Sequence, residues 1–175
     1  MEKTNEEYIK LSNDYTDTHR QNIATAFNML LPKLISNNIL SKQEISEIKS
    51  NLKIHDLSKY QVEEALPYGK FFFGERNDEV IAGFKRAVKL HKGRNPHHPE
   101  YFAKENKPIT MPNVYIVEMV CDWWTFGIKD NNLAEIFDFY KEKKEKFNFS
   151  QDTAKKVEIL LGLIKEVIEE KQIAK

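Results

Sequence analysis

The strongest constraint on the fold is a long run of helical periodicity near the start of the chain. Between about Asn5 and Ser36, one stripe of side chains recurs at steps of three and four residues: Tyr15, His19, Ile23, Ala26, Leu30 and Leu34. This spacing places the stripe on one face of an α-helix, which Pro32 should kink near its end. Such a helix needs other elements to cover its apolar face.

The rest of the chain repeats this helical pattern. A capping box at Ser41 and Glu44 and an N-cap at Asn77 mark two helix starts. Helices are predicted from Ser41, over Ile54 to Glu64, from Asn77 to Leu90, from Pro112 to Phe126, over Leu133 to Lys146 and after Ser150, with a turn at Pro67 to Gly69. No segment shows strand periodicity. We therefore expect an all-α bundle of about six to seven helices in one domain over residues 1–175, closed by helices of residues 133–173.

One irregular stretch interrupts this helical pattern. Residues 93–112 contain four prolines and two of the five histidines of the chain. A loop of this length is uncommon in a small domain and is more often functional than decorative. The stretch is therefore a candidate part of a functional site.

Composition excludes several functional classes. Lys+Arg and Asp+Glu both number 27 among the 175 residues, so the chain lacks the basic surface needed to coat nucleic acid. No apolar run approaches the ~20 residues that cross a bilayer, so no membrane partner is expected. The single cysteine, Cys121, has no partner for an intramolecular disulfide, which fits a reducing compartment. We expect a cytoplasmic protein.

His55 and Asp56 are the first candidate metal ligands. A neutral imidazole next to a carboxylate offers two ligands of mixed softness to one divalent ion. Taken alone, such a dipeptide is more often a pair on a helix surface. Two other residues change this interpretation: His19 lies on the apolar face of the first helix, and Asp122 lies within an apolar segment where an unpaired carboxylate is costly. Glu118 lies one turn before Asp122 and shares its face.

The order His19, His55-Asp56, Asp122, with intervals of 36 and 66 residues, resembles the H…HD…D ligand pattern of the HD-domain superfamily of metal-dependent phosphohydrolases. The resemblance extends from about residue 15 to residue 126. It implies that these four residues come from separate helices of an HD-like bundle and bind a divalent ion, which could be Mn, Fe, Co, Ni, Zn or Mg. With such an ion bound, Asp56 or Asp122 would orient an attacking water, so both are candidate catalytic residues.

Three further histidines leave the number of metal ions open at one or two. His91, His97 and His98 lie between the HD pair and the last aspartate, as do the extra histidines of HD members with more than one metal. Their spacing is narrower than in those members. The alternative is that they bind the substrate phosphate, a role considered above all for His98.

Several polar residues are candidates for binding substrate. The segment His55 to Lys59 resembles the HD-x-x-K variant of the superfamily, and Lys59 could bind a phosphate, protonate a leaving oxygen or pair with Glu63 at the surface. The remaining candidates, each with a plain surface or core role as its alternative, are Lys92, Arg94, His98, Tyr101 and Glu118.

The combined pattern predicts a metal-dependent phosphohydrolase that acts on a nucleotide or nucleotide-like phosphate. Two alternatives stay open, namely a di-iron oxygenase of the HD type and a nucleotide-binding regulator without turnover. The segments HDLSKY, NPHHPEYF and CDWW also resemble small HD-related proteins of bacteria and their phages, for which no reaction is assigned. The last helix could either close the bundle or pair with a second copy in a homodimer, and we expect it to close the bundle.

Overall fold

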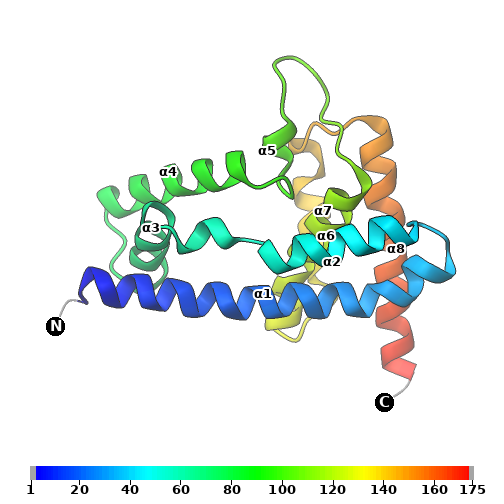
Figure 1. The fold of residues 1–175 in the computed structure, drawn as a ribbon, viewed down its shortest axis with the longest axis horizontal. Helices are drawn as coiled ribbons and strands as arrows, with labels where there is room; N and C mark the ends of the chain where they lie inside the picture. Colours follow the sequence, from blue (N-terminus) through cyan, green and yellow to red (C-terminus); the bar gives the residue numbers. More distant parts are fainter. Residues whose placement is uncertain (1–2, 174–175) are drawn as a thin grey trace.

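The computed structural model describes residues 3–173, and this part of the chain is all-helical, as predicted (Figure 1). It contains more helices than the six to seven expected, because the region after His55 is divided and a short helix lies in the proline-rich stretch. The α-helices are α1 (Asn5–Ser36), α2 (Lys42–Ile54), α3 (Val62–Phe73), α4 (Asp78–Arg94), α5 (Pro99–Phe102), α6 (Asn113–Lys129), α7 (Glu135–Lys143) and α8 (Gln151–Ile173). Two short 3₁₀ helices are η1 (Leu57–Tyr60) and η2 (Lys144–Lys146).

Local signals fix most helix starts where the sequence predicted them. The first helix spans Asn5–Ser36, as expected, and continues through Pro32. A capping box joins the Ser41 hydroxyl and the Glu44 side chain to each other's backbone amides at the start of α2. The Asn77 side chain accepts a hydrogen bond from the Val80 amide and caps α4. These bonds satisfy amides that the first helical turn leaves without partners.

The predicted helix over Ile54 to Glu64 is wrong. Helix α2 ends at Ile54, His55 lies in a turn with φ of −52° and ψ of 129°, and Asp56 has a left-handed backbone with φ of 60°. An aspartate tolerates this conformation better than most residues, so the chain changes direction at the HD pair before η1 begins.

The predicted turn at Pro67 to Gly69 is also wrong, because both residues lie inside α3. Gly69 serves helix packing: a Cβ atom at this position would lie 2.2 Å from the backbone oxygen of Tyr8 in α1. A glycine that looked like a turn signal instead lets two helices approach closely.

Helix α6 runs through the hydrophobic core and is buried along most of its length. Helices α1, α2 and α8 pack around it (Figure 1). Both tryptophans of α6 belong to this core. Trp124 donates a hydrogen bond to the Leu133 carbonyl at 2.9 Å, and Trp123 stacks on Phe147. The apolar face of α8 joins the same core through Val157, Leu160, Leu161, Ile164 and Ile168.

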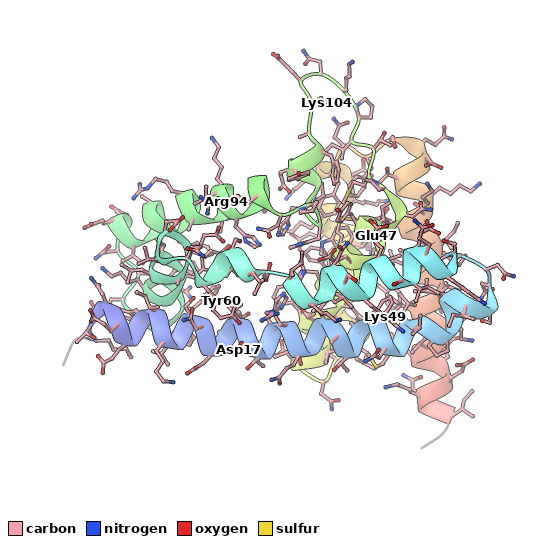
Figure 2. All side chains as sticks on the ribbon, viewed as in Figure 1. Asp17, Glu47, Lys49, Tyr60, Arg94 and Lys104 are labelled. Atoms are coloured by element: carbon pink, nitrogen blue, oxygen red, sulfur yellow. The ribbon has the colours of Figure 1, made fainter. Side chains whose placement is uncertain are left out.

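The HD pair lies where three parts of the bundle meet. Helix α1 extends along one side, and α3 and α4 form a group at its N-terminal half, while α6, α7 and α8 gather near its C-terminal half (Figure 1). The α2–η1 junction lies between these groups. Residues 95–112 are irregular apart from α5, and Lys104 marks the part of this stretch that projects from the bundle (Figure 2).

Among residues 3–173, no helix has both the length and the apolar character required to cross a bilayer.

Candidate metal centre

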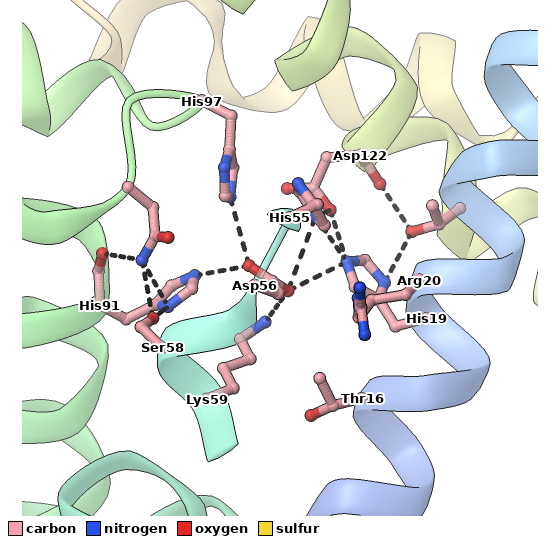
Figure 3. Close-up of polar contacts among 12 residues, drawn as sticks. Thr16, His19, Arg20, His55, Asp56, Ser58, Lys59, His91, His97 and Asp122 are labelled. Carbon is pink, nitrogen blue, oxygen red and sulfur yellow. Dashed lines mark hydrogen bonds and ion pairs between the residues drawn. The ribbon is translucent and has the colours of Figure 1, made fainter. Parts of the chain in front are cut away.

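All five histidines of the chain gather around Asp56 in the interior of the bundle, and Figure 3 shows His19, His55, His91 and His97 among them. They come from α1, the end of α2, α4 and the segment between α4 and α5. Asp122 joins them from α6. Residues that are far apart in the sequence therefore provide one continuous set of potential metal ligands.

The first cluster consists of His19, His55, Asp56 and Asp122, the four residues of the H…HD…D pattern. His19 Nε2 lies 2.9 Å from Asp122 Oδ1, 3.3 Å from Asp56 Oδ2 and 3.3 Å from His55 Nε2. His55 Nε2 lies 3.6 Å from Asp56 Oδ2 and 3.9 Å from Asp122 Oδ1. One nitrogen or oxygen of each residue thus points to a common centre, and such mixed nitrogen and oxygen donors suit a divalent transition metal.

Hydrogen bonds behind the first cluster set the orientation of its two imidazoles. His55 Nδ1 lies 2.9 Å from the buried carboxylate of Glu118. His19 Nδ1 lies 3.3 Å from Thr125 Oγ1, whose hydroxyl donates to the Asp122 carbonyl at 2.6 Å, so the threonine oxygen accepts the proton on His19 Nδ1. In both rings Nε2 is left with a free lone pair that faces the cluster, as a metal ligand requires.

The second cluster consists of His91, His97, His98 and the other carboxylate oxygen of Asp56. His91 Nε2 and His97 Nε2 lie 3.2 and 3.4 Å from Asp56 Oδ1. One ring nitrogen of His98 lies within 4.8 Å of ligand nitrogens of His91 and His97. His91 and His97 therefore face Asp56 on the side opposite the first cluster (Figure 3), and His98 joins them there.

A buried carboxylate also orients the second cluster. Glu64 Oε2 lies 2.9 Å from His91 Nδ1 and accepts a hydrogen bond from the Ser58 hydroxyl. Asn95 donates to Ser58 Oγ, and Arg94 Nη1 lies 3.4 Å from the other oxygen of Glu64. These contacts leave His91 Nε2 as the nitrogen that faces Asp56, in the carboxylate–histidine arrangement common behind metal ligands.

The left-handed backbone of Asp56 allows its carboxylate to contact both clusters. Its side chain is 1% exposed, and its left-handed φ of 60° turns the carboxylate between the two clusters. Backbone strain of this kind persists where the surrounding structure holds a functional residue in place. Among residues 3–173, Asp56 alone places one carboxylate oxygen in each cluster.

Neighbouring lysine and histidine side chains stabilise the charged forms of both aspartates in the clusters. Burial opposes ionisation of Asp56, but Lys59 and His55 hold its pKa well below the usual range. Burial likewise opposes ionisation of Asp122, and His19 lowers its pKa. Both aspartates are therefore anionic at neutral pH, as metal ligation requires.

The pKa is raised for two histidines of the clusters and lowered for two others. Burial disfavours the charged forms of His55 and His91, yet Asp56 with Glu118 raises the pKa of His55, and Asp56 with Glu64 raises that of His91. Burial lowers the pKa of His97, and it lowers that of His98 to about 2 with help from His97. His97 and His98 are therefore neutral at physiological pH and have lone pairs available.

The best evidence that the second cluster fits a cation is a set of buried atoms without hydrogen bonds. Asp56 Oδ1 and the Nε2 atoms of His91, His97 and His98 are all buried in the described structure and make none. Buried polar groups nearly always have a partner, so four such atoms gathered in one place need an explanation. A divalent ion would supply it, because it bonds to lone pairs. The buried histidines and carboxylates are thus positioned to hold metal, and the element stays open.

The candidate substrate-binding residues have different positions. Lys59 reaches the centre, with Nζ 2.6 Å from Asp56 Oδ2, and it does not pair with Glu63. Glu118 lies behind His55, where it orients a ligand and is shielded from any substrate. His98 belongs to the second cluster.

The other three candidates lie outside the clusters. Lys92 pairs with Glu100 at the surface, and Tyr101 is 48% exposed and packs on Phe102. Arg94 is partly exposed and pairs with Glu63 and Glu64 (Figure 2). Its guanidinium is therefore committed to carboxylates, one of which supports His91.

Sequence reasoning missed the supporting residues Ser58, Glu64, Asn95 and Thr125. Weak signals existed for two of them: Asn95 follows His91 by one helical turn, and Thr125 follows Asp122 by three residues. Nothing in the local pattern marks Glu64 as buried, because it lies among residues typical of an exposed first helical turn.

Comparison with models of protein families gives a match over most of the chain. A family model described as a family of unknown function, DUF5662, matches residues 9–163. No curated protein and no solved structure matches the chain.

Proposed function

The chain belongs to the DUF5662 family, and we propose that it is a metal-dependent phosphohydrolase of the HD-domain type that uses two metal ions. The observation that carries the proposal is the position of Asp56. Each of its carboxylate oxygens faces a separate group of imidazoles, and the H…HD…D residues form one of these groups.

The proposed ligands follow from the two clusters. His19, His55, Asp56 and Asp122 would hold one ion, and His91, His97, His98 and Asp56 would hold the other. When bound, divalent ions lower the pKa of water and offset the negative charge of phosphoryl oxygens. No nucleophilic side chain is then needed, which agrees with the burial of the only cysteine, Cys121.

Lys59 has the best position for binding a substrate phosphate. Burial opposes its charge, but Asp56 raises its pKa, so the ammonium remains protonated at neutral pH. A group so strongly basic is a poor proton donor to a leaving oxygen, because general acids work best with a pKa near the operating pH. We therefore assign Lys59 to holding a phosphoryl oxygen by charge and hydrogen bonding.

Asp122 is the ligand best placed to orient the attacking water. Its side chain is 14% exposed, whereas those of His55 and Asp56 are 0% and 1% exposed. Its lowered pKa keeps it anionic, so its oxygen can accept a hydrogen bond from a water at the solvent-facing edge of the centre. A nucleotide or nucleotide-like phosphate ester is the substrate class that we propose.

Oxygen activation by two irons is a second candidate, favoured by the shared carboxylate and by the imidazole-rich second cluster. Imidazole and carboxylate ligands suit iron as well as manganese or zinc. Lys59 favours hydrolysis, since a fixed cation at the centre suits an anionic substrate. Iron-loaded protein with a ferric absorption band and no phosphatase activity would support the oxygenase.

Turnover tests the proposal. Wild-type protein reconstituted separately with Mn, Fe, Co, Ni, Zn and Mg is assayed against nucleoside monophosphates, diphosphates and cyclic nucleotides, with Asp56→Ala as the control. We expect wild type to release phosphate or to open a cyclic ester, and Asp56→Ala to lose this activity. If the two proteins are equally inactive with bound metal in wild type, the hydrolase proposal fails and a binding role replaces it.

A further inference from the structure

Most of the metal centre is buried. The side chains of His55, Asp56, His91 and His97 are all at most 3% exposed. The side chains of His19, Asp122 and Lys59 are 11%, 14% and 16% exposed, and His98 is also partly exposed. One accessible edge of the first cluster lies where α1 and α6 contribute His19 and Asp122, and a substrate can approach it there.

A hollow of about 80 Å³ lies beside His19 between α1 and α6. Its lining comes from one face of α1 and the end of α6: Tyr15, Thr18, His19, Asn22, Thr125, Phe126 and Lys129. Sites for whole drug-sized ligands are usually several times larger. This hollow can therefore hold one part of a substrate next to the first cluster.

The rim of the hollow is aromatic. Phe126 is 46% exposed, although its neighbours Trp124, Thr125 and Gly127 are buried. An exposed phenyl ring on a core helix, beside a potential metal ligand, provides a free face for stacking. A single exposed phenylalanine on a surface would need no explanation. This one, however, lines a hollow that includes His19, a residue of the first cluster.

Tyr15 also lines the hollow, where Phe72 and Lys129 hold its ring in place. Its ring stacks on Phe72 with the centroids 5.5 Å apart, and Lys129 Nζ lies 5.1 Å from its centroid. These contacts fix the tyrosine ring before any ligand arrives. Thr18 and Asn22 add hydroxyl and amide groups that can bond to the edge of a planar ligand.

We propose that the hollow beside His19 is a specificity subsite, in which the nucleobase of the substrate stacks on Phe126 against the wall formed by Tyr15 while its phosphate lies at the first cluster. This inference rests on the proposed function for the position of the phosphate. Aromatic side chains stack on any base, and Lys129, Asn22 and Thr18 would distinguish between bases by hydrogen bonding. The subsite thus favours nucleotides over phosphate esters that have no ring.

Binding to the manganese-loaded protein tests the subsite without requiring turnover. Calorimetry compares each of four nucleoside 5′-monophosphates with ribose 5-phosphate, which shares the sugar and phosphate but has no base. We expect at least one nucleotide to bind about tenfold more tightly than ribose 5-phosphate, and Phe126→Ala to abolish this preference. Tyr15→Phe, which retains the ring, should preserve it.

A matched control removes an exposed apolar side chain elsewhere. Ile159 in α8 is 41% exposed, and Ile159→Ala should bind nucleotides as wild type does. Circular dichroism and metal content establish that each variant is folded and loaded, and Phe126→Leu serves as the ring-free variant if Phe126→Ala does not fold.

The outcomes separate this inference from the proposed function. A nucleotide preference that depends on Phe126, without hydrolysis, supports the subsite and contradicts the hydrolase. Hydrolysis with equal binding of ribose 5-phosphate and every nucleotide overturns the subsite and leaves the hydrolase intact. A nucleotide preference that survives both Phe126→Ala and Phe126→Leu also overturns it.

Discussion

Oδ1 of Asp56 lies 3.2 Å from Nε2 of His91, while Oδ2 of the same carboxylate lies 3.3 Å from Nε2 of His19. If both clusters bind metal, His91→Ala should lose the ion of the second cluster and keep that of the first. His19→Ala should lose the ion of the first cluster and keep that of the second. Asp56→Ala should lose both, since it supplies an oxygen to each site. Inductively coupled plasma mass spectrometry after gel filtration measures the stoichiometry. Two ions retained in His91→Ala would refute the second site.

Glu64 should act on metal affinity through His91. Glu64→Gln removes the charge that accepts the His91 Nδ1 proton, and loss of such a partner typically weakens metal binding by ~10- to 100-fold. Glu63→Gln is the matched control, because Glu63 is exposed and pairs only with Arg94 at 3.2 Å. Competition with a chromogenic chelator gives both affinities, and equal values for the two variants would rule out this role.

Gly69 should be essential for the packing of α3 against α1. Gly69→Ala places a Cβ 2.2 Å from the Tyr8 carbonyl oxygen, so the helices must separate, and we expect a loss of about 1–3 kcal/mol in the free energy of unfolding. Gly162→Ala is the control, since its Cβ meets no atom within 4 Å, and alanine should stabilise α8 by about 0.5–1 kcal/mol. Urea denaturation measures the free energy of unfolding of both variants and distinguishes the predicted loss from the predicted gain. An unchanged free energy of unfolding in Gly69→Ala would show that the close contact is not maintained.

Cys121 should react slowly with thiol reagents even in alkaline solution. Burial raises the pKa of its thiol, and Glu118 and Asp122 add to the increase, so the reactive thiolate does not accumulate as pH rises through the ordinary thiol range near 8.5. Labelling with a disulfide reagent between pH 7 and 9 should stay slow in the native protein and become fast in guanidinium. Rapid native labelling that increases tenfold per pH unit would contradict the buried position.

Helix positions were predictable because their signals are local. The periodicity from Tyr15 to Leu34, the capping box at Ser41 and the N-cap at Asn77 each depend on residues within a few positions of one another. The break at His55 and Asp56 was not predictable, since local pattern does not reveal that the carboxylate must face two clusters at once. Tertiary contacts require the left-handed Asp56.

The candidate site could be predicted in part for a similar reason. Ligand residues stand out because histidines and aspartates are unusual on apolar faces, as at His19 and Asp122. The supporting residues resemble ordinary surface residues until the fold buries them. Glu64 is 0% exposed because α4 brings His91 over it. Glu118 was identified as a candidate, but it was assigned to substrate binding because its partner His55 is 63 residues away in the sequence.

Anomalous X-ray diffraction from crystals of the manganese-loaded protein would show directly whether Asp56 lies between two metal ions. We expect two strong peaks on opposite sides of the Asp56 carboxylate, one among His19, His55 and Asp122 and the other among His91, His97 and His98. The absence of peaks next to Asp56 at saturating manganese, with the protein folded, would contradict the proposed two-metal centre.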